Sequence, residues 1–139
     1  MELTEFNKEV VRRFNKIVVE GDEAAFLEIM HVDFINKTAA LVNIPSGADG
    51  VWHTFNNVLR PALSNFRIEI YDQVAEGDKV TTRKAIMGTH TGQWFDVAPT
   101  NRQVRIDVID IVTVRDGKYY EHWGVNTLQA VLASLRKSE

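Results

Sequence analysis

The spacing of apolar residues changes near residue 66, and this change constrains the fold more than any other feature of the sequence. Before it, apolar side chains recur three and four positions apart, which is the pattern of amphipathic helices. After it, apolar and polar side chains alternate, which is the pattern of half-buried strands. A run of helices followed by a run of strands predicts an α+β protein.

Three helices are predicted in the N-terminal half. Thr4 is the expected N-cap of the first helix, which Gly21 ends. Asp22 is expected to cap the second helix, and Pro61 to end or kink the third. Residues 31–38, between the second and third helices, leave room for a short strand.

Four antiparallel strands and a closing helix are predicted in the C-terminal half. The first strand begins at residue 66, the others cover 79–90, 104–115 and 118–123, and the closing helix carries Leu128, Val131, Leu132 and Leu135. A strongly twisted sheet curls around whatever packs on it. We therefore expect a single domain over residues 1–139, in which a curved antiparallel sheet wraps around the N-terminal helices as a cone with an apolar pocket.

Composition narrows the possible functions. The 139 residues suit one domain, and a net charge of −3 with both signs interspersed predicts no nucleic-acid partner. The absence of cysteine excludes disulfides and thiolate chemistry, and the four histidines lack the paired spacing of metal ligands. No apolar run reaches transmembrane length and the N-terminus is unlike a signal peptide. The expectation is a cytoplasmic protein without membrane contact.

The strand 104–115 carries one acid where an apolar residue is expected. Its two faces are Val104, Ile106, Val108, Asp110, Val112 and Val114 on one side, and Arg105, Asp107, Ile109, Ile111, Thr113 and Arg115 on the other. A carboxylate on the apolar face is costly unless it is paired or protonated. Asp110 is therefore either a functional acid or a structural one that caps backbone or pairs with an arginine such as Arg83.

Five short motifs follow one another between residues 88 and 123. They are Gly88-Thr89-His90-Thr91-Gly92, Pro99-Thr100-Asn101-Arg102, Asp110-Ile111-Val112, Asp116-Gly117-Lys118 and Glu121-His122-Trp123. Their order and spacing resemble the G-T-H-x-G, P-T-G-R, D-x-x-R, D-G-K and E-H-W elements of the SnoaL-like polyketide cyclases, within the nuclear-transport-factor-2-like superfamily. Asn101 stands where the family usually has glycine, and Thr113 where it commonly has arginine.

The resemblance implies a deep apolar pocket and no cofactor. Family members in antibiotic pathways close a ring by intramolecular aldol condensation of a polyketide ester. Asp110 matches their general acid/base, His90 a catalytic pocket histidine, and Asn36 a pocket asparagine. His90 also suits a strand-end residue bonded to a loop, and Asn36 a turn residue.

Further candidates for contact with a substrate are aromatic. Trp52, Trp94 and Phe95 are suited to wall an apolar pocket, because large rings bury area at low entropic cost. Trp94 and Phe95 fall in a predicted loop and suit a lid or a subunit interface equally well. His122 is another candidate, although alternation alone does not say whether its face or that of Trp123 looks inward. We expect Trp123 in the core.

Two hypotheses follow from these residues. The first is a cofactor-independent cyclase that acts on a small apolar carbonyl compound by proton transfer through Asp110. Under this hypothesis, burial should raise the pKa of Asp110. An isomerase or a hydrolase that uses the same pocket is a variant of this hypothesis. The second is a non-catalytic module that binds a hydrophobic ligand or dimerises. Under both, Ile109 and Ile111 on the outer face of the sheet suit a homodimer.

Overall fold

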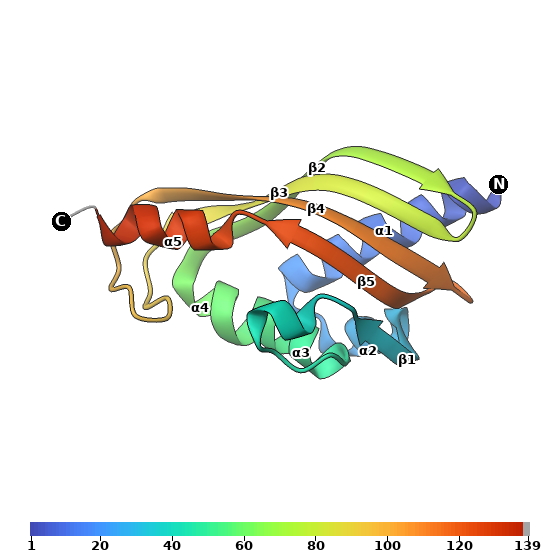
Figure 1. The fold of residues 1–139 in the computed structure, drawn as a ribbon, viewed down its shortest axis with the longest axis horizontal. Helices are drawn as coiled ribbons and strands as arrows, with labels where there is room; N and C mark the ends of the chain where they lie inside the picture. Colours follow the sequence, from blue (N-terminus) through green and yellow to red (C-terminus); the bar gives the residue numbers. More distant parts are fainter. Residues whose placement is uncertain (138–139) are drawn as a thin grey trace.

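A computed structural model describes residues 1–137 and confirms the α+β architecture (Figure 1). In chain order the elements are α1 (Leu3–Glu20), α2 (Glu23–Ile29), β1 (Met30–Asn36), the 3-10 turn η1 (Ala39–Val42), α3 (Ala48–His53), the π-helical turn η2 (Thr54–Leu59), α4 (Arg60–Ala62), β2 (Leu63–Glu76), β3 (Lys79–His90), β4 (Gln103–Arg115), β5 (Lys118–Asn126) and α5 (Leu128–Arg136). No helix in this part of the chain is both long and apolar enough to cross a membrane.

The helix boundaries follow the sequence signals with one exception. Gly21, at φ 73°, ends α1, and the Asp22 carboxylate accepts a hydrogen bond from the backbone N–H of Ala25 at the start of α2. The predicted cap at Thr4 is wrong, because α1 begins two residues earlier and Glu2 occupies its N-cap. Residues 48–62 form one continuous helical run, and the run ends one residue after Pro61.

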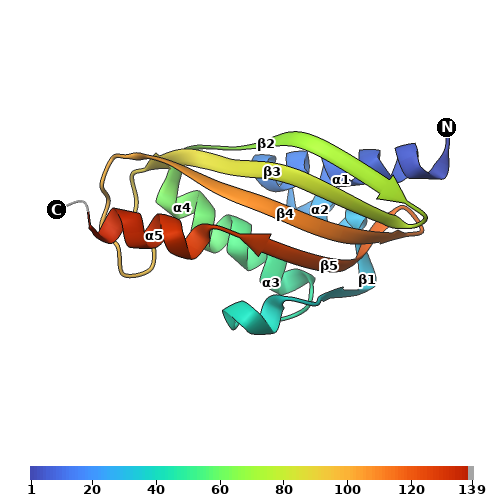
Figure 2. The same cartoon turned by 45° about the horizontal axis from the view of Figure 1, so that its top comes forward.

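The sheet has five strands in the order β1-β5-β4-β3-β2. The four predicted strands pair antiparallel as expected, and β1 adds a fifth strand parallel to β5. Figure 2 shows β2 to β5 as one curved sheet, with α1 and α2 behind it and α5 continuing from the end of β5. The helices α1 and α5 pack on opposite ends of the sheet.

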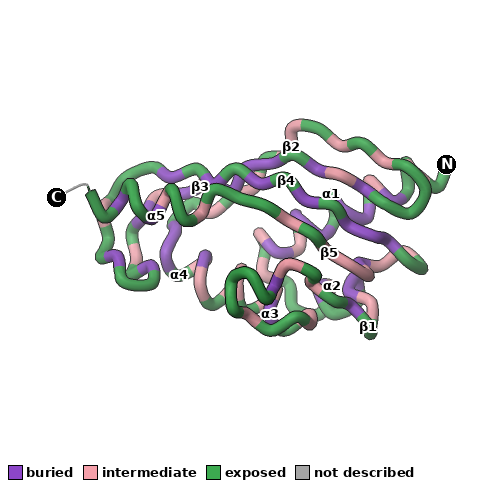
Figure 3. Tube along the Cα trace, viewed as in Figure 1, coloured by how far each residue is buried: buried purple, intermediate pink, exposed green. Residues whose placement is uncertain are grey.

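Alternation along β4 places Asp110 on the inner face, as predicted. All six residues of its apolar face are buried, whereas Arg105, Asp107, Ile109 and Ile111 on the other face are exposed. Figure 3 shows this alternation of buried and exposed positions along the strands. The strand β4 therefore turns a nearly continuous apolar face, interrupted by Asp110, toward the helices.

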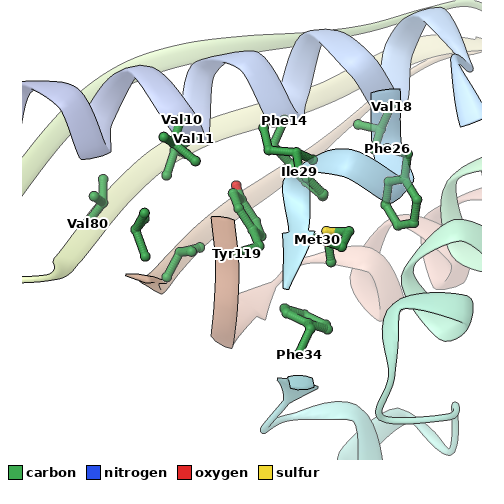
Figure 4. Packing of buried hydrophobic residues seen from close by; sticks show 12 residues of the cluster. Val10, Val11, Phe14, Val18, Phe26, Ile29, Met30, Phe34, Val80 and Tyr119 are labelled. Atoms are coloured by element: carbon green, nitrogen blue, oxygen red, sulfur yellow. The ribbon is translucent and has the colours of Figure 1, made fainter. Parts of the chain in front are cut away.

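Simple alternation fails on β5. Thr113 pairs with Glu121, but Val114 pairs with Tyr119, so one extra residue is inserted in β5 at this point. The insertion brings Tyr119 to the inner face, where its hydroxyl end points toward α1 (Figure 4). Trp123 remains on the outer face with 51% of its surface exposed, so its predicted place in the core is wrong.

Two apolar clusters make up the core. The first, shown in Figure 4, comprises Val10, Val11, Phe14, Val18, Phe26, Ile29, Met30, Phe34, Val80, Val112, Val114 and Tyr119. The second comprises Leu59, Ala62, Leu63, Ile86, Trp94, Val97, Val104, Ile106, Val108, Leu132 and Leu135. On β4 the division between them falls at Asp110, which lies between Val108 of one cluster and Val112 of the other.

Candidate functional site

A row of polar residues crosses the sheet where the two apolar clusters meet. This polar belt consists of Asn36 on β1, His122 on β5, Asp110 on β4, Thr82 and Lys84 on β3, and Gln73 on β2. The strand register aligns it, since Asn36 pairs with His122, Asp110 with Thr82, and Thr82 with Gln73. Every strand therefore contributes one or two polar side chains to a single layer.

Asp110 is the centre of the polar belt. One carboxylate oxygen, Oδ2, lies 3.2 Å from Lys84 Nζ and 3.4 Å from His122 Nε2. The side chains of Asp110 and Lys84 are only 2% and 4% exposed. The other oxygen, Oδ1, is buried and has no hydrogen-bond partner within residues 1–137. Asp110 thus keeps one acceptor atom for a further group.

Lys84 is held in place from α1. Its ammonium donates a 2.7 Å hydrogen bond to the side-chain oxygen of Asn15, whose amide in turn donates to the backbone carbonyl of Val11 at 2.8 Å. Asn15 is itself buried. The lysine therefore bridges a helix and a strand through two oxygen acceptors.

His122 connects Asp110 to the surface. Its Nδ1 lies 3.1 Å from the side-chain oxygen of Asn36, which also accepts hydrogen bonds from the backbone N–H and hydroxyl of Thr38. Both ring nitrogens of His122 therefore lie beside side-chain oxygens, one of Asn36 and one of Asp110. A quarter of the His122 side chain is exposed.

Gly124 allows His122 to lie against Asp110. It pairs with Asp110 across the β4–β5 ladder. A Cβ atom at this position would stand 2.7 Å from His122 Cε1 and 3.2 Å from Nε2. A larger residue would therefore push the imidazole away from the carboxylate.

The pKa of Asp110 lies below its ordinary value of 3.8. Burial is the largest single influence and raises the pKa, but the charge of Lys84 and the hydrogen bond and charge of His122 together outweigh it. The expected upward shift of the Asp110 pKa is therefore wrong. The sequence predicts the burial that raises this pKa, but it does not reveal the buried lysine beside the acid. Burial, followed by the Asp110 charge, raises the pKa of Tyr119 well above 10.

The structure does not bring His90 to Asp110. His90 lies eight residues along β3 from Thr82, the partner of Asp110, which is a distance of about 26 Å. It is fully buried, and its Nδ1 lies 3.0 Å from the Thr100 hydroxyl and accepts from the Thr100 backbone N–H. This matches the expectation of a strand-end histidine bonded to a loop, with a threonine in place of a carbonyl.

The predicted aromatic wall is dispersed. Trp94 is fully buried beside His90, with ring centroids 5.7 Å apart, and Phe95 next to it is more than half exposed. Trp52 packs on Phe26, 5.1 Å between centroids, at the edge of the first cluster. Of the predicted site residues, Asp110, His122 and Asn36 come together.

Two cavities lie near the C-terminal helix rather than at Asp110. One, of about 480 Å³, is lined by residues 96–100, Arg102, Leu135 and Arg136. The other, of about 340 Å³, lies between the start of β4 and α5. Neither is lined by Asp110 or His122, so neither is the pocket expected to end at Asp110. Within residues 1–137 no three acidic, histidine or cysteine side chains are grouped to hold a metal ion.

Sequence reasoning missed Lys84, Asn15 and Gly124. Lys84 carries the same signal as Asp110, because it alternates with Val80, Thr82 and Ile86 on the inner face of its strand. A cation and an acid on the apolar faces of neighbouring strands are candidates for a pair. Nothing in the sequence links Asn15 to either of them.

The family of the chain follows from its sequence. The family model for the SnoaL-like polyketide cyclases matches residues 8–135. The chain belongs to this family. No match was found among curated protein sequences.

Solved structures of similar proteins share the fold of this SnoaL-like chain. TsrD from Streptomyces laurentii is 19% identical with a TM-score of 0.82, and the match covers 100% of this chain and 99% of that one. IdmH, a proposed polyketide cyclase from Streptomyces antibioticus, is 24% identical with a TM-score of 0.78, covering 94% and 98%. A proposed polyketide cyclase from Bacillus cereus is 27% identical with a TM-score of 0.78, covering 94% and 80%.

Proposed function

We propose that this protein is a cofactor-independent enzyme of the cyclase type that acts on a small, largely apolar carbonyl compound by proton transfer at Asp110. The observation that carries the proposal is a buried carboxylate with one oxygen contacted by Lys84 and His122 and the other without a partner among the described residues. Buried acids with specific charge partners occur preferentially at functional sites. Family membership supports a small-molecule substrate.

The proposed reaction is an intramolecular aldol ring closure. Asp110 Oδ1 accepts a proton from the carbon next to one carbonyl of the substrate, and that carbon then bonds to a second carbonyl carbon. The protonated Asp110 returns its proton to the resulting alkoxide, so that no proton is gained or lost overall. His122, held by Asn36, contacts Asp110 Oδ2 and orients the carboxylate for this step. His90, Trp94 and Phe95 are not given a role in this step.

Exchange of a carbonyl compound's α protons with solvent tests the first step without requiring the natural substrate. The rate of deuterium incorporation into 2-tetralone in D₂O, followed by proton NMR, is expected to rise above the buffer rate with the wild type. Asp110→Asn is expected to lose about 10²-fold or more of that acceleration. Asp107→Asn is the matched control, since Asp107 lies on the exposed face of the same strand. An unchanged rate in Asp110→Asn contradicts the proposal.

A non-catalytic ligand-binding module is the second candidate, favoured by the lowered pKa of Asp110, which the acid/base hypothesis expects to be raised, and by the two cavities elsewhere. Under this alternative, neither the wild type nor Asp110→Asn accelerates exchange, and a ligand in a co-crystal lies away from Asp110. An isomerase or hydrolase would share the exchange step with a cyclase. NMR of the products would distinguish these three reactions.

A further inference from the structure

We propose that Lys84 is a positioning residue that keeps Asp110 ionised inside the apolar core, and that Asn15 holds Lys84 in place for this task. The charge state of Asp110 is a property of the folded protein. Its catalytic consequence rests on the function proposed above, because a protonated carboxyl cannot begin that reaction as a base.

Strand register explains why Lys84 reaches Asp110. Thr82 pairs directly with Asp110, and Lys84 is the next residue of β3 on the same inner face. The side chain of Lys84 extends across this two-residue displacement along β3, and its Nζ lies 3.2 Å from Asp110 Oδ2. Two apolar clusters flank this contact, so water does not screen the two charges.

Three side chains from two strands face Asp110, and Lys84 is the buried lysine among them. From β3 Asp110 faces Lys84, and from β5 it faces His122 and the Tyr119 phenol, which is uncharged at neutral pH and whose pKa burial raises further. From α1 comes the neutral amide of Asn15, which contacts Lys84 rather than Asp110. Lys84 is therefore the almost fully buried cationic side chain that contacts Asp110.

Without a cation, burial would favour the protonated acid. Burial is the largest influence on the pKa of Asp110 and raises it, and the charge of Lys84 is the largest influence that lowers it. Lys84 also occupies Oδ2 together with His122. It therefore sets both the charge of Asp110 and the oxygen, Oδ1, that is left to accept a proton.

Carbon-13 NMR of the Asp110 carboxyl, assigned by comparison with Asp110→Asn, tests this inference without a substrate. In Lys84→Met the titration midpoint of Asp110 is expected to rise by about 1–3 pH units, and in Lys84→Arg it should stay near that of the wild type. Asn15→Leu should raise it by less, because the charge remains but is no longer held. Lys79→Met is the matched control, since Lys79 lies on the same strand and contacts Thr113. An unchanged midpoint in Lys84→Met overturns the proposal.

A double variant tests the proposal even if Lys84→Met does not fold. If Lys84→Met does not fold at neutral pH, Lys84→Met/Asp110→Asn, which lacks both charges, is expected to fold. Failure of this double variant when Asp110→Asn alone folds would assign Lys84 a packing role and overturn the proposal.

The 2-tetralone exchange rate separates this inference from the proposed function. If both hold, the acidic limb of the pH–rate profile moves up in Lys84→Met together with the carboxyl midpoint. A moved midpoint with no exchange at any pH supports the role of Lys84 and contradicts the enzyme. Exchange that depends on Asp110 with an unmoved midpoint supports the enzyme and contradicts the role of Lys84.

Discussion

Asp110 and Lys84 form a charged pair inside the core, and neither side chain is exposed enough for water to stabilise it alone. Removing both ions from water costs about as much as their attraction returns, so the pair by itself adds little net stability. The cost of separating the two charges is larger, because the remaining charge then stays buried without a partner. The stability of variants that remove one charge or both measures this difference between the two costs.

Lys84→Met is expected to lower the free energy of unfolding by about 3–5 kcal/mol, because the buried Asp110 loses its lysine partner and must either stay charged without it or take up a proton. Urea unfolding at pH 7 measures the loss. Lys84→Met/Asp110→Asn should recover at least half of it. Asp107→Asn, which breaks an exposed pair with Arg105, should cost less than about 1 kcal/mol. Equal losses in the single and double variants would contradict a charge coupling.

The pH dependence of stability follows from the lowered pKa of Asp110. The folded state binds the Asp110 proton less readily than the unfolded state, whose carboxyl has the ordinary value of 3.8. The pair's contribution is therefore complete above that value and is lost as pH falls through the folded pKa. Between about pH 5 and pH 2, the wild type should lose more unfolding free energy than Lys84→Met/Asp110→Asn. A constant difference between the two would refute the assigned direction.

The strands β4 and β5 decide which side chains meet Asp110. On β4 strict alternation holds up to Val112, whereas one inserted residue on β5 places Tyr119, His122 and Gly124 on the inner face together. A hydrophobic pattern predicts alternation, but an insertion depends on the partner strand and leaves no local pattern. This is why the faces of β4 were predictable and those of β5 were not.

Gly124→Ala is expected to displace the His122 ring from Asp110, because the new Cβ would stand 2.7 Å from Cε1. The ring is partly exposed and can turn outward, so the loss of stability should stay within about 1 kcal/mol. Nitrogen-15 NMR of the imidazole should show the hydrogen bond to Asp110 lost, and 2-tetralone exchange should fall at least tenfold. Gly77→Ala, where a Cβ meets nothing within 4 Å, is a control for the space-filling effect. Gly77→Ala should itself lower the stability, because Gly77 has a φ of 59°, a conformation that alanine rarely adopts.

The outer face of the whole molecule carries an apolar patch formed by four residues of β4 and β5. Ile109 lies opposite Val125 and Ile111 opposite Trp123, and all four are 39–69% exposed. An exposed contiguous apolar patch on a sheet is typical of an interaction surface. We propose that two copies of the chain pair through this patch.

Trp123→Arg is expected to convert a dimer into a monomer, because it places a charge in the middle of the patch. Light scattering after size-exclusion chromatography should give twice the chain mass of 15.8 kDa for the wild type and the single mass for the variant. Val32→Arg, on the exposed part of β1, is the matched control and should remain a dimer. A monomeric wild type would rule out this role for the patch.

The local pattern of the sequence was sufficient to determine the fold class, the order of the main helices and the four antiparallel strands, and the inward position of Asp110. Each of these depends on periodicity within one segment, which is a short-range property of the chain. The tertiary structure alone decided that β1 joins β5 in parallel, that Trp123 stays outside, and that Lys84, Asn15 and His122 surround the acid. It also reversed the expected direction of the Asp110 pKa shift, because the shift depends on a cation 26 residues away in the chain that only strand pairing brings within 3.2 Å.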